Sequence, residues 1–223
     1  MFRQHLIESG SSEEEADAMF GIVLKLQRER TDWTAILFDK VYSHATPGFR
    51  LEPNALLVTA VDGVKPGVAL EVAMGQGRNA VFLAANGWDV TGFDLSREGL
   101  AIAERDAAEI GVSITTLLAD HRGFDYGSGQ WDLIVSTYSV APLTDPGHVG
   151  RLGRSLRSGG MIVVESFASG ATETNRRPVD LDPAELRGAF REFEIRHFED
   201  VEDTADWAPG ESSRIVRMIA IRP

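Results

Sequence analysis

The sequence predicts an α/β protein with a doubly wound, mostly parallel seven-stranded sheet, an antiparallel C-terminal hairpin and an N-terminal helical segment. From Lys65 onward, short apolar runs alternate with helical stretches, which is the order that builds a parallel sheet with helices on both faces. The last two apolar runs have no helical period between them, so they can pair antiparallel. The 223 residues correspond to one domain with a modest appendage, at roughly 100–200 residues per domain.

Residues 1–64 are predicted to form a helical cap segment in front of the main domain, residues 65–223. Ser12 and Glu15 have the spacing of a capping box, in which each side chain bonds the backbone amide of the other residue. An apolar stripe follows at helical spacing and must pack on something. The stripe is Met19, Phe20, Val23, Leu24 and Leu26. Two further helices are expected, one that Asp32 begins and Pro47-Gly48 ends, and a short one that follows Pro53-Asn54 and ends before Gly63.

The main domain is expected to alternate strands with helices up to its C-terminal hairpin. Ser96 is the expected cap of the second helix, and Gly111 its end. Ser158-Gly159-Gly160 are expected to close the third helix, and the acidic stretch 199–211 is expected to be a solubilising connection. Strands are predicted at 68–72, 88–93, 112–118, 131–136, 161–167, 193–198 and 215–221, with helices at 79–86, 97–110, 147–157 and 183–189.

Composition disfavours several classes of partner. The formal net charge is −12, from 34 acidic and 22 basic residues, so no nucleic acid or anionic membrane partner is expected. The absence of cysteine excludes disulfides and thiolate catalysis, and the five scattered histidines predict no metal site. The N-terminus shows neither a signal-peptide pattern nor a long apolar stretch, which predicts a soluble cytoplasmic protein.

The strongest chemical signal lies between the first strand and its helix. Gly75 and Gly77 would let the backbone approach a ligand closely beside a helix N-terminus, although a tight turn alone could also need them. Three acids, Glu71, Asp94 and Asp120, fall at or near the C-terminal ends of three successive strands. Open α/β sheets bind their ligands at that edge, and an acid there can meet the hydroxyls of a ribose.

These segments resemble the ordered motifs of the class I S-adenosylmethionine-dependent methyltransferases, most closely the small-molecule, tellurite-resistance type. The resemblance covers about residues 65–167 well and the C-terminal hairpin loosely. It implies a Rossmann-like fold, S-adenosylmethionine as cofactor, S-adenosylhomocysteine as product, and in-line methyl transfer to a small molecule. Met74 departs from the family, which usually has a small residue or Cys there, and it should narrow the space near the methionine moiety. The motifs are ALEVAMGQGRNAVFLA, VTGFDLS, LLAD, WDLIVSTYS and LRSGGMIVVES.

The resemblance also implies residue roles. Glu71 would orient the glycine loop or bind the methionine amino group, indirectly or through water. Asp94 would hold the ribose hydroxyls, and Asp120 would read the adenine amino group. The remaining implied cofactor contacts are Gly75 and Gly77 under the methionine part and ribose, Leu95 on adenine, Ala119 and His121 beside Asp120, Arg78 and Asn79 after the glycines, and Ser136 on the methyl-transfer side.

A base is needed only if the acceptor carries a proton at working pH. The candidates are Tyr138 and His121, although Tyr138 could equally be a pocket wall and His121 an adenine-side contact. The acceptor itself is expected to meet Tyr42, Phe49, Arg50, Thr137 and Tyr138. Trp33 and Phe38 are at least as well explained by helix packing, and the chain could be a monomer or a homodimer.

Two other functions fit parts of the pattern. A nicotinamide-dependent oxidoreductase is one, because Gly75, Gly77 and Ala80 satisfy a dinucleotide fingerprint. The antiparallel end and the absence of a Tyr-x-x-x-Lys pair count against it. The other is a nucleoside-binding module without turnover.

Overall fold

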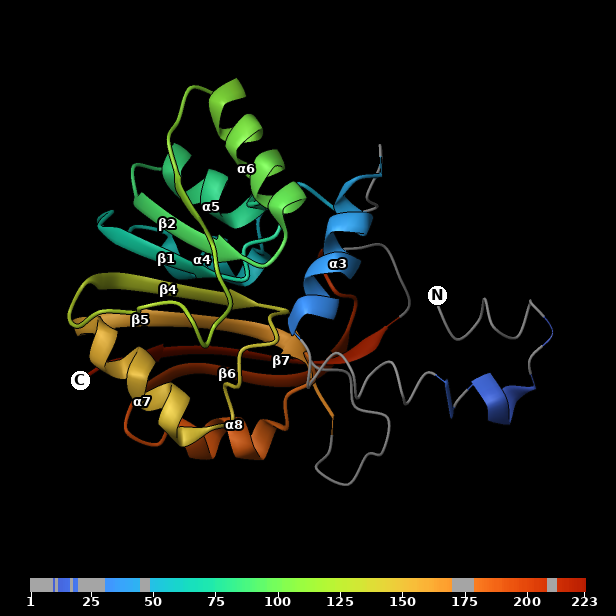
Figure 1. Cartoon of the computed structure of the whole chain (residues 1–223). Helices are drawn as coiled ribbons and strands as arrows, with labels where there is room; N and C mark the ends of the chain where they lie inside the picture. The colour runs from blue at the N-terminus through green and yellow to red at the C-terminus, as the bar shows by residue number, and fades with distance from the viewer. Residues whose placement is uncertain are drawn as a thin grey trace.

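The computed structural model describes residues 10, 12–16, 18–19, 31–44, 49–169, 179–207 and 212–223. Its centre is a seven-stranded sheet with the strand order β3-β2-β1-β4-β5-β7-β6 (Figure 1). Strands β1 to β5 are parallel to one another, whereas β7 runs antiparallel to both β5 and β6. The predicted fold, including its antiparallel end, is confirmed. The strands are β1 Val68–Val72, β2 Asp89–Asp94, β3 Thr115–Leu118, β4 Trp131–Thr137, β5 Leu156–Phe167, β6 Glu194–Asp203 and β7 Ser213–Ile221.

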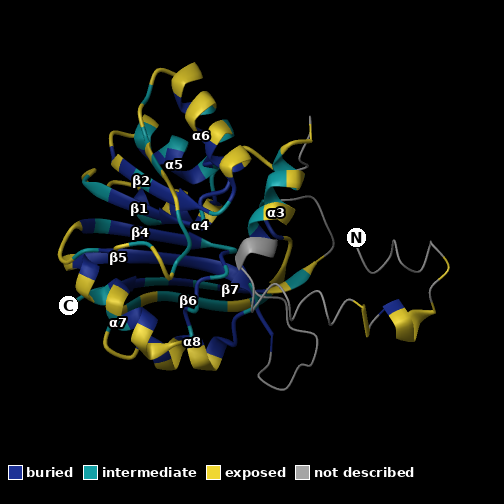
Figure 2. Cartoon of the chain, viewed as in Figure 1, coloured by how far each residue is buried: buried dark blue, intermediate teal, exposed yellow. Residues whose placement is uncertain are grey.

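Helices cover both faces of the sheet, because the inner strands are apolar on both sides. Leu70 and Ile134 of the sheet belong to one buried cluster, which helices α7 and α8 cover, while Leu133 belongs to a second cluster under α4, α5 and α6. Figure 2 shows the sheet buried between helices whose outer sides are exposed. The helices are α4 Ala55–Val61, α5 Arg78–Ala85, α6 Arg97–Glu109, α7 Pro146–Ser155 and α8 Pro183–Ala189.

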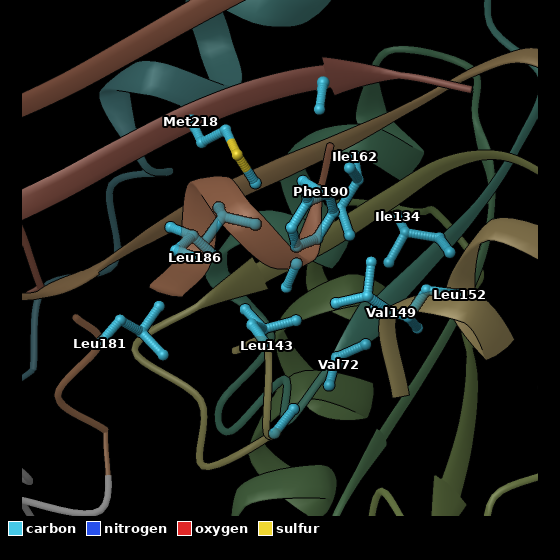
Figure 3. Packing of buried hydrophobic residues seen from close by; sticks show 14 of the residues in the cluster. Val72, Ile134, Leu143, Val149, Leu152, Ile162, Leu181, Leu186, Phe190 and Met218 are labelled. Atoms are coloured by element: carbon cyan, nitrogen blue, oxygen red, sulfur yellow. The ribbon is translucent and has the colours of Figure 1, made fainter. Parts of the chain in front are cut away.

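The α8 side of the core shows how the antiparallel end is held. Leu186 of α8 and Phe190, the residue directly after this helix, point toward Ile162 of β5 and Met218 of β7 (Figure 3), and all four side chains are fully buried. Burying side chains of this size stabilises the fold by about 1.5–3 kcal/mol each. The core therefore ties the hairpin strand β7 to the parallel part of the sheet.

Side-chain caps fix where several helices begin. The Ser96 hydroxyl accepts from the Gly99 amide at 3.0 Å and begins α6, as predicted. Asn54 caps α4 through the Leu57 amide at 3.0 Å. The N-cap of α5 is Gly77, whose φ of 76° lies in the left-handed region that glycine adopts without strain.

The N-terminal segment is described in parts. The predicted capping box is present, with the Glu15 carboxylate accepting from the Ser12 amide at 2.9 Å. Helix α3, Thr31–Tyr42, reaches the sheet edge, where its Asp39 accepts from the Ser96 hydroxyl at 2.6 Å. Met19 is exposed, while Phe20, Val23, Leu24 and Leu26 of the predicted stripe, and the side chain of Trp33, lie outside the described residues.

Two expectations about connections were wrong. Ser158-Gly159-Gly160 do not close α7, because that helix ends at Ser155 and β5 already begins at Leu156. Strand β6 extends to Asp203, so the first half of the acidic stretch is paired strand. Its Asp200 bonds Arg214 at 2.7 Å, and Asp203 bonds Arg217 at 2.7 Å. Glu199, Asp200 and Asp203 thus have basic partners on β7 that local sequence does not reveal.

No helix among the described residues is both long enough and apolar enough to cross a membrane.

Candidate functional site

A cavity of about 550 Å³ lies at the C-terminal edge of the parallel strands. Such a volume is in the usual range of small-molecule sites. Its floor comes from the segments that follow β1, β2, β3 and β4, and Tyr42 and Phe49 border it from the N-terminal segment. Of the predicted site residues, the cavity is lined by Tyr42, Phe49, Arg50, Glu71, Gly75, Arg78, Asn79, Asp94, Leu95, Ala119, Asp120, His121, Thr137 and Tyr138.

Two of the predicted site residues lie outside the cavity lining, whereas Met74 borders it. Gly77 does not border the cavity, because it caps α5 and lies against Ala103 of α6. Ser136 also lies outside the lining and is fully buried, with its hydroxyl 2.7 Å from that of Ser139. Met74 borders the cavity, but its side chain packs against Gly92 of β2 rather than only narrowing the ligand space.

Glu71 is a buried carboxyl group with one oxygen unused. Its Oε1 accepts from Asn79 Nδ2 at 2.9 Å, whereas Oε2 is buried and has no hydrogen-bond partner within the described ranges. Burial raises the pKa of Glu71 to about 7. A cationic group that reached Oε2 would satisfy the oxygen and favour the ionised form.

Asp94 holds the glycine loop in place. Its Oδ2 accepts from the Gly75 amide and its Oδ1 from the Ser96 amide, both at 2.8 Å. Burial nevertheless raises the pKa of Asp94. Gly75 has a φ of 54°, and any Cβ there would collide with the Tyr42 hydroxyl group. The loop therefore needs glycine both for its conformation and for the closeness of Tyr42.

The third acid ends β3. Asp120 Oδ1 accepts from the amides of Arg122 at 3.0 Å and Gly123 at 2.6 Å, which shapes the turn after the strand. His121 beside it borders the cavity, and its ring meets that of His148 edge to face at 5.8 Å. Burial lowers the pKa of His121. The imidazole is therefore neutral near pH 7 and is chemically able to accept a proton.

Tyr138 is fixed at both ends to one residue of β5. Its amide donates to the Glu165 carbonyl at 2.7 Å, and its hydroxyl donates to Glu165 Oε1 at 2.9 Å. Its φ of 52° is unusual for a residue with a side chain and costs of the order of 1–3 kcal/mol. Burial, together with the Glu165 carboxylate, raises the pKa of Tyr138. The phenol therefore stays protonated, which disfavours it as a base.

A buried polar network joins the N-terminal segment to the far side of the cavity. Asn54 Nδ2 lies 2.9 Å from Glu165 Oε1 and 2.8 Å from Asp206 Oδ2. Arg78 donates to Asp206 Oδ1 at 2.7 Å, and the Asn54 amide donates to Asn79 at 2.8 Å. This network fixes Asp206, in the connection between β6 and β7, beside the helix that follows the glycine loop.

A cluster of aromatic rings also lines the cavity. Trp207 lies 5.1 Å from Phe49, 5.8 Å from Tyr138 and 6.3 Å from Phe167, measured between ring centroids. Sequence reasoning missed Phe167, Trp207 and Glu165. Phe167 and Trp207 border the cavity, and Glu165 bonds the Tyr138 hydroxyl beside it. A carboxylate in an apolar strand and a tryptophan in an acidic stretch were the available signals, and neither indicates a position near the cavity.

The part of the chain that the structure describes contains no cluster of three or more His, Asp or Glu side chains able to hold a metal ion.

Comparison with known proteins identifies the domain that carries this cavity. Residues 69–160 match the family described as "Methyltransferase domain". The ribosomal RNA small subunit methyltransferase C of Alcanivorax borkumensis is 31% identical over 111 residues, which are 48% of this chain and 33% of that protein. The chain thus spans about a third of the length of this curated relative.

Solved structures share the fold. TehB from Haemophilus influenzae superposes with a TM-score of 0.63 at 19% identity, covering 75% of this chain and 61% of its own. Geranyl diphosphate C-methyltransferase from Streptomyces coelicolor superposes with a TM-score of 0.60 at 14% identity, covering 76% and 77%. At these identities the likeness establishes the architecture alone, while the family match assigns residues 69–160 to a methyltransferase domain.

Proposed function

We propose that this chain, which carries a class I methyltransferase domain, transfers a methyl group from S-adenosylmethionine to a small molecule. The observation that carries the proposal is the set of three acids at the C-terminal edge of the sheet. Glu71, Asp94 and Asp120 border one cavity, around a glycine loop that approaches it with its backbone. The domain match over residues 69–160 supports methyl transfer as the chemistry of that edge.

The residues present fit the cofactor. The unpaired Glu71 Oε2 suits the amino group of the methionine part, and Asp94 suits the ribose hydroxyls. Asp120, with Ala119 and His121, suits the adenine end, while Leu95 offers an apolar contact. The cofactor supplies an already activated methyl group, so the protein contributes mainly by orienting the acceptor and excluding water.

The borders of the cavity and the net charge of the chain support the proposal that the methyl acceptor is a small molecule. The cavity is bordered by the N-terminal segment as well as the sheet edge, which leaves space for a small ligand. A formal net charge of −12 makes a polyanion such as RNA an unfavourable partner, although a distant relative is a ribosomal RNA methyltransferase. Arg50 borders the cavity and is the cation that a small anionic group would meet first.

If the acceptor carries a proton, we assign its removal to His121 rather than to Tyr138. The neutral imidazole borders the cavity, whereas the Tyr138 hydroxyl already donates to Glu165. We assign Tyr138 and Thr137 to the wall on the methyl-transfer side, where the strained backbone of Tyr138 holds its ring against Trp207 and Phe167.

Methyl transfer is tested directly with purified protein, methyl-labelled S-adenosylmethionine and a panel of thiols, phenols, amines and oxyanions. We expect label in the product of at least one class, and little transfer by Asp94→Ala. Asp200→Ala is the matched control, because Asp200 is an aspartate outside the cavity lining. Failure of transfer across the whole panel, with intact cofactor binding, would favour the non-catalytic binding module instead.

A further inference from the structure

Arg50 is a cation at the border of the cavity whose side chain is available to a ligand. The residue is exposed, and its guanidinium group has no hydrogen bond or ion pair with the part of the chain that the structure describes. Arg78, the other arginine of the lining, differs, because it donates to Asp206 Oδ1 at 2.7 Å and to the Glu52 carbonyl at 2.9 Å. An anionic group in the cavity would therefore find its open cationic partner in Arg50.

The backbone of Arg50 is fixed beside the glycine loop. Its carbonyl accepts from Gln76 Nε2 at 3.0 Å, and Gln76 stands between Gly75 and Gly77. Its amide donates to the Trp207 carbonyl at 2.8 Å. Both backbone polar groups are thus occupied, and the exposed side chain is what this residue offers to a ligand.

The residues after Arg50 continue the same alignment. The Glu52 carbonyl accepts from Arg78 Nη1 at 2.9 Å, and the Asn54 amide donates to Asn79 Oδ1 at 2.8 Å. This short segment therefore runs alongside the glycine loop and the first residues of α5. Its contacts place Arg50 at the glycine-loop end of the cavity.

Glu71 belongs to the same end. Asn79, which the segment contacts, donates to Glu71 Oε1 at 2.9 Å, and both residues border the cavity. The amino acid part of the cofactor carries an ammonium group and a carboxylate on one carbon atom. Glu71 suits the first group, and a guanidinium fork suits the second, because it can bind a carboxylate through two parallel charge-assisted hydrogen bonds.

We propose that the Arg50 guanidinium group binds the carboxylate of the methionine part of S-adenosylmethionine. Arg50 then selects cofactor molecules that keep this carboxylate. The inference rests on the proposed function, because it takes the cavity to be the site of that cofactor. It moves Arg50 from the methyl acceptor, where the sequence suggests it, to the cofactor.

Two ligands that differ by one carboxyl group test the proposal on the full chain. Decarboxylated S-adenosylhomocysteine keeps the nucleoside and the amino group of S-adenosylhomocysteine but lacks its carboxylate. We expect calorimetry at about pH 8, where Glu71 is ionised, to show S-adenosylhomocysteine binding about tenfold more tightly than the decarboxylated ligand.

Arg50→Gln should remove this preference by weakening S-adenosylhomocysteine alone, with the affinity for the decarboxylated ligand unchanged. Arg50→Lys keeps the charge but not the fork, so it should keep part of the preference. Arg105→Gln is the matched control, because Arg105 is an exposed arginine of α6 outside the cavity lining, and it should leave both affinities unchanged.

Three results would overturn the proposal. They are equal binding of the two ligands to the original chain, a preference that survives in Arg50→Gln, and an equal loss of affinity for both ligands in that variant. The last would show that the substitution disturbs the glycine loop rather than a carboxylate contact. All three leave the proposed function standing, whereas failure of both ligands to bind the original chain would overturn the function itself.

Discussion

At the scale of single residues, the three acids at the sheet edge differ in what their carboxylates already bind. Asp94 and Asp120 accept backbone amides and so shape the loops after β2 and β3 before any ligand binds. Glu71 instead accepts from the Asn79 side chain, and its Oε2 is buried without a hydrogen bond that meets the usual geometry among the described residues. A buried carboxyl group with a free oxygen is poised to respond to a cation.

The affinity for S-adenosylhomocysteine should depend on pH through Glu71. Burial raises the pKa of Glu71 to about 7, so the group is neutral below that pH and ionised above it. The ligand ammonium group favours the ionised carboxylate. The affinity should therefore rise as pH increases from about 5.5 to about 8, approaching tenfold per pH unit below the pKa.

Calorimetry at several pH values measures this dependence, and Glu71→Gln should flatten it while weakening binding at high pH. Asp94 also has a raised pKa, so the variant is needed to assign the effect. A dependence that is unchanged in Glu71→Gln would show that another group titrates.

Elements whose signals are local were predicted well from the sequence. The caps Ser96 and Asn54 act within three residues of themselves, and both helices begin where those caps place them. The length of β6 was missed because it depends on pairing with β7, including the bonds from Arg214 and Arg217 to Asp200 and Asp203. Strand ends set by a distant partner leave little trace in local composition.

Asn54 joins three elements, so its replacement should cost more than a lost cap. Asn54→Ala removes the α4 cap and the donors to Glu165 and Asp206. We expect it to lower the free energy of unfolding by about 2–4 kcal/mol, measured as a shift in the urea midpoint.

Asn54→Asp separates the two effects, because aspartate caps a helix equally well but repels the two neighbouring carboxylates. We expect it to be destabilised about as strongly as Asn54→Ala. Stability equal to that of the original chain would show that the bridge to β5 and to the connection between β6 and β7 contributes little.

At the scale of the whole molecule, the sequence predicts which acids form the floor of the cavity but not which distant aromatic residues form its wall. The floor follows from the parallel sheet, since the ends of successive strands meet at one edge, and the three acids found there were predicted from their spacing. The wall brings together Phe49, Phe167 and Trp207, which are far apart in the sequence. The antiparallel pairing of β7 with β5 and β6, together with the bond from the Arg50 amide to the Trp207 carbonyl, places Trp207 beside the cavity. Its position could not be predicted from its neighbours in the chain.

At the scale of the whole molecule, the acidic residues of the chain divide by what they contact. All 34 acids enter the formal net charge of −12, which disfavours polyanionic partners. Several of them are structural, because Glu165, Glu199 and Asp203 surround Arg217, and Asp206 holds Arg78. Glu71, Asp94 and Asp120 remain for the ligand.

The most direct test of the central claim is titration calorimetry of the full chain with S-adenosylhomocysteine and, separately, with NAD. The account predicts saturable binding of S-adenosylhomocysteine and no comparable binding of NAD. It also predicts that Asp94→Ala weakens the former by about 1–3 kcal/mol, because buried polar partners are left unpaired. Tight binding of NAD with no response to S-adenosylhomocysteine would contradict the assignment of this cavity to methyl transfer.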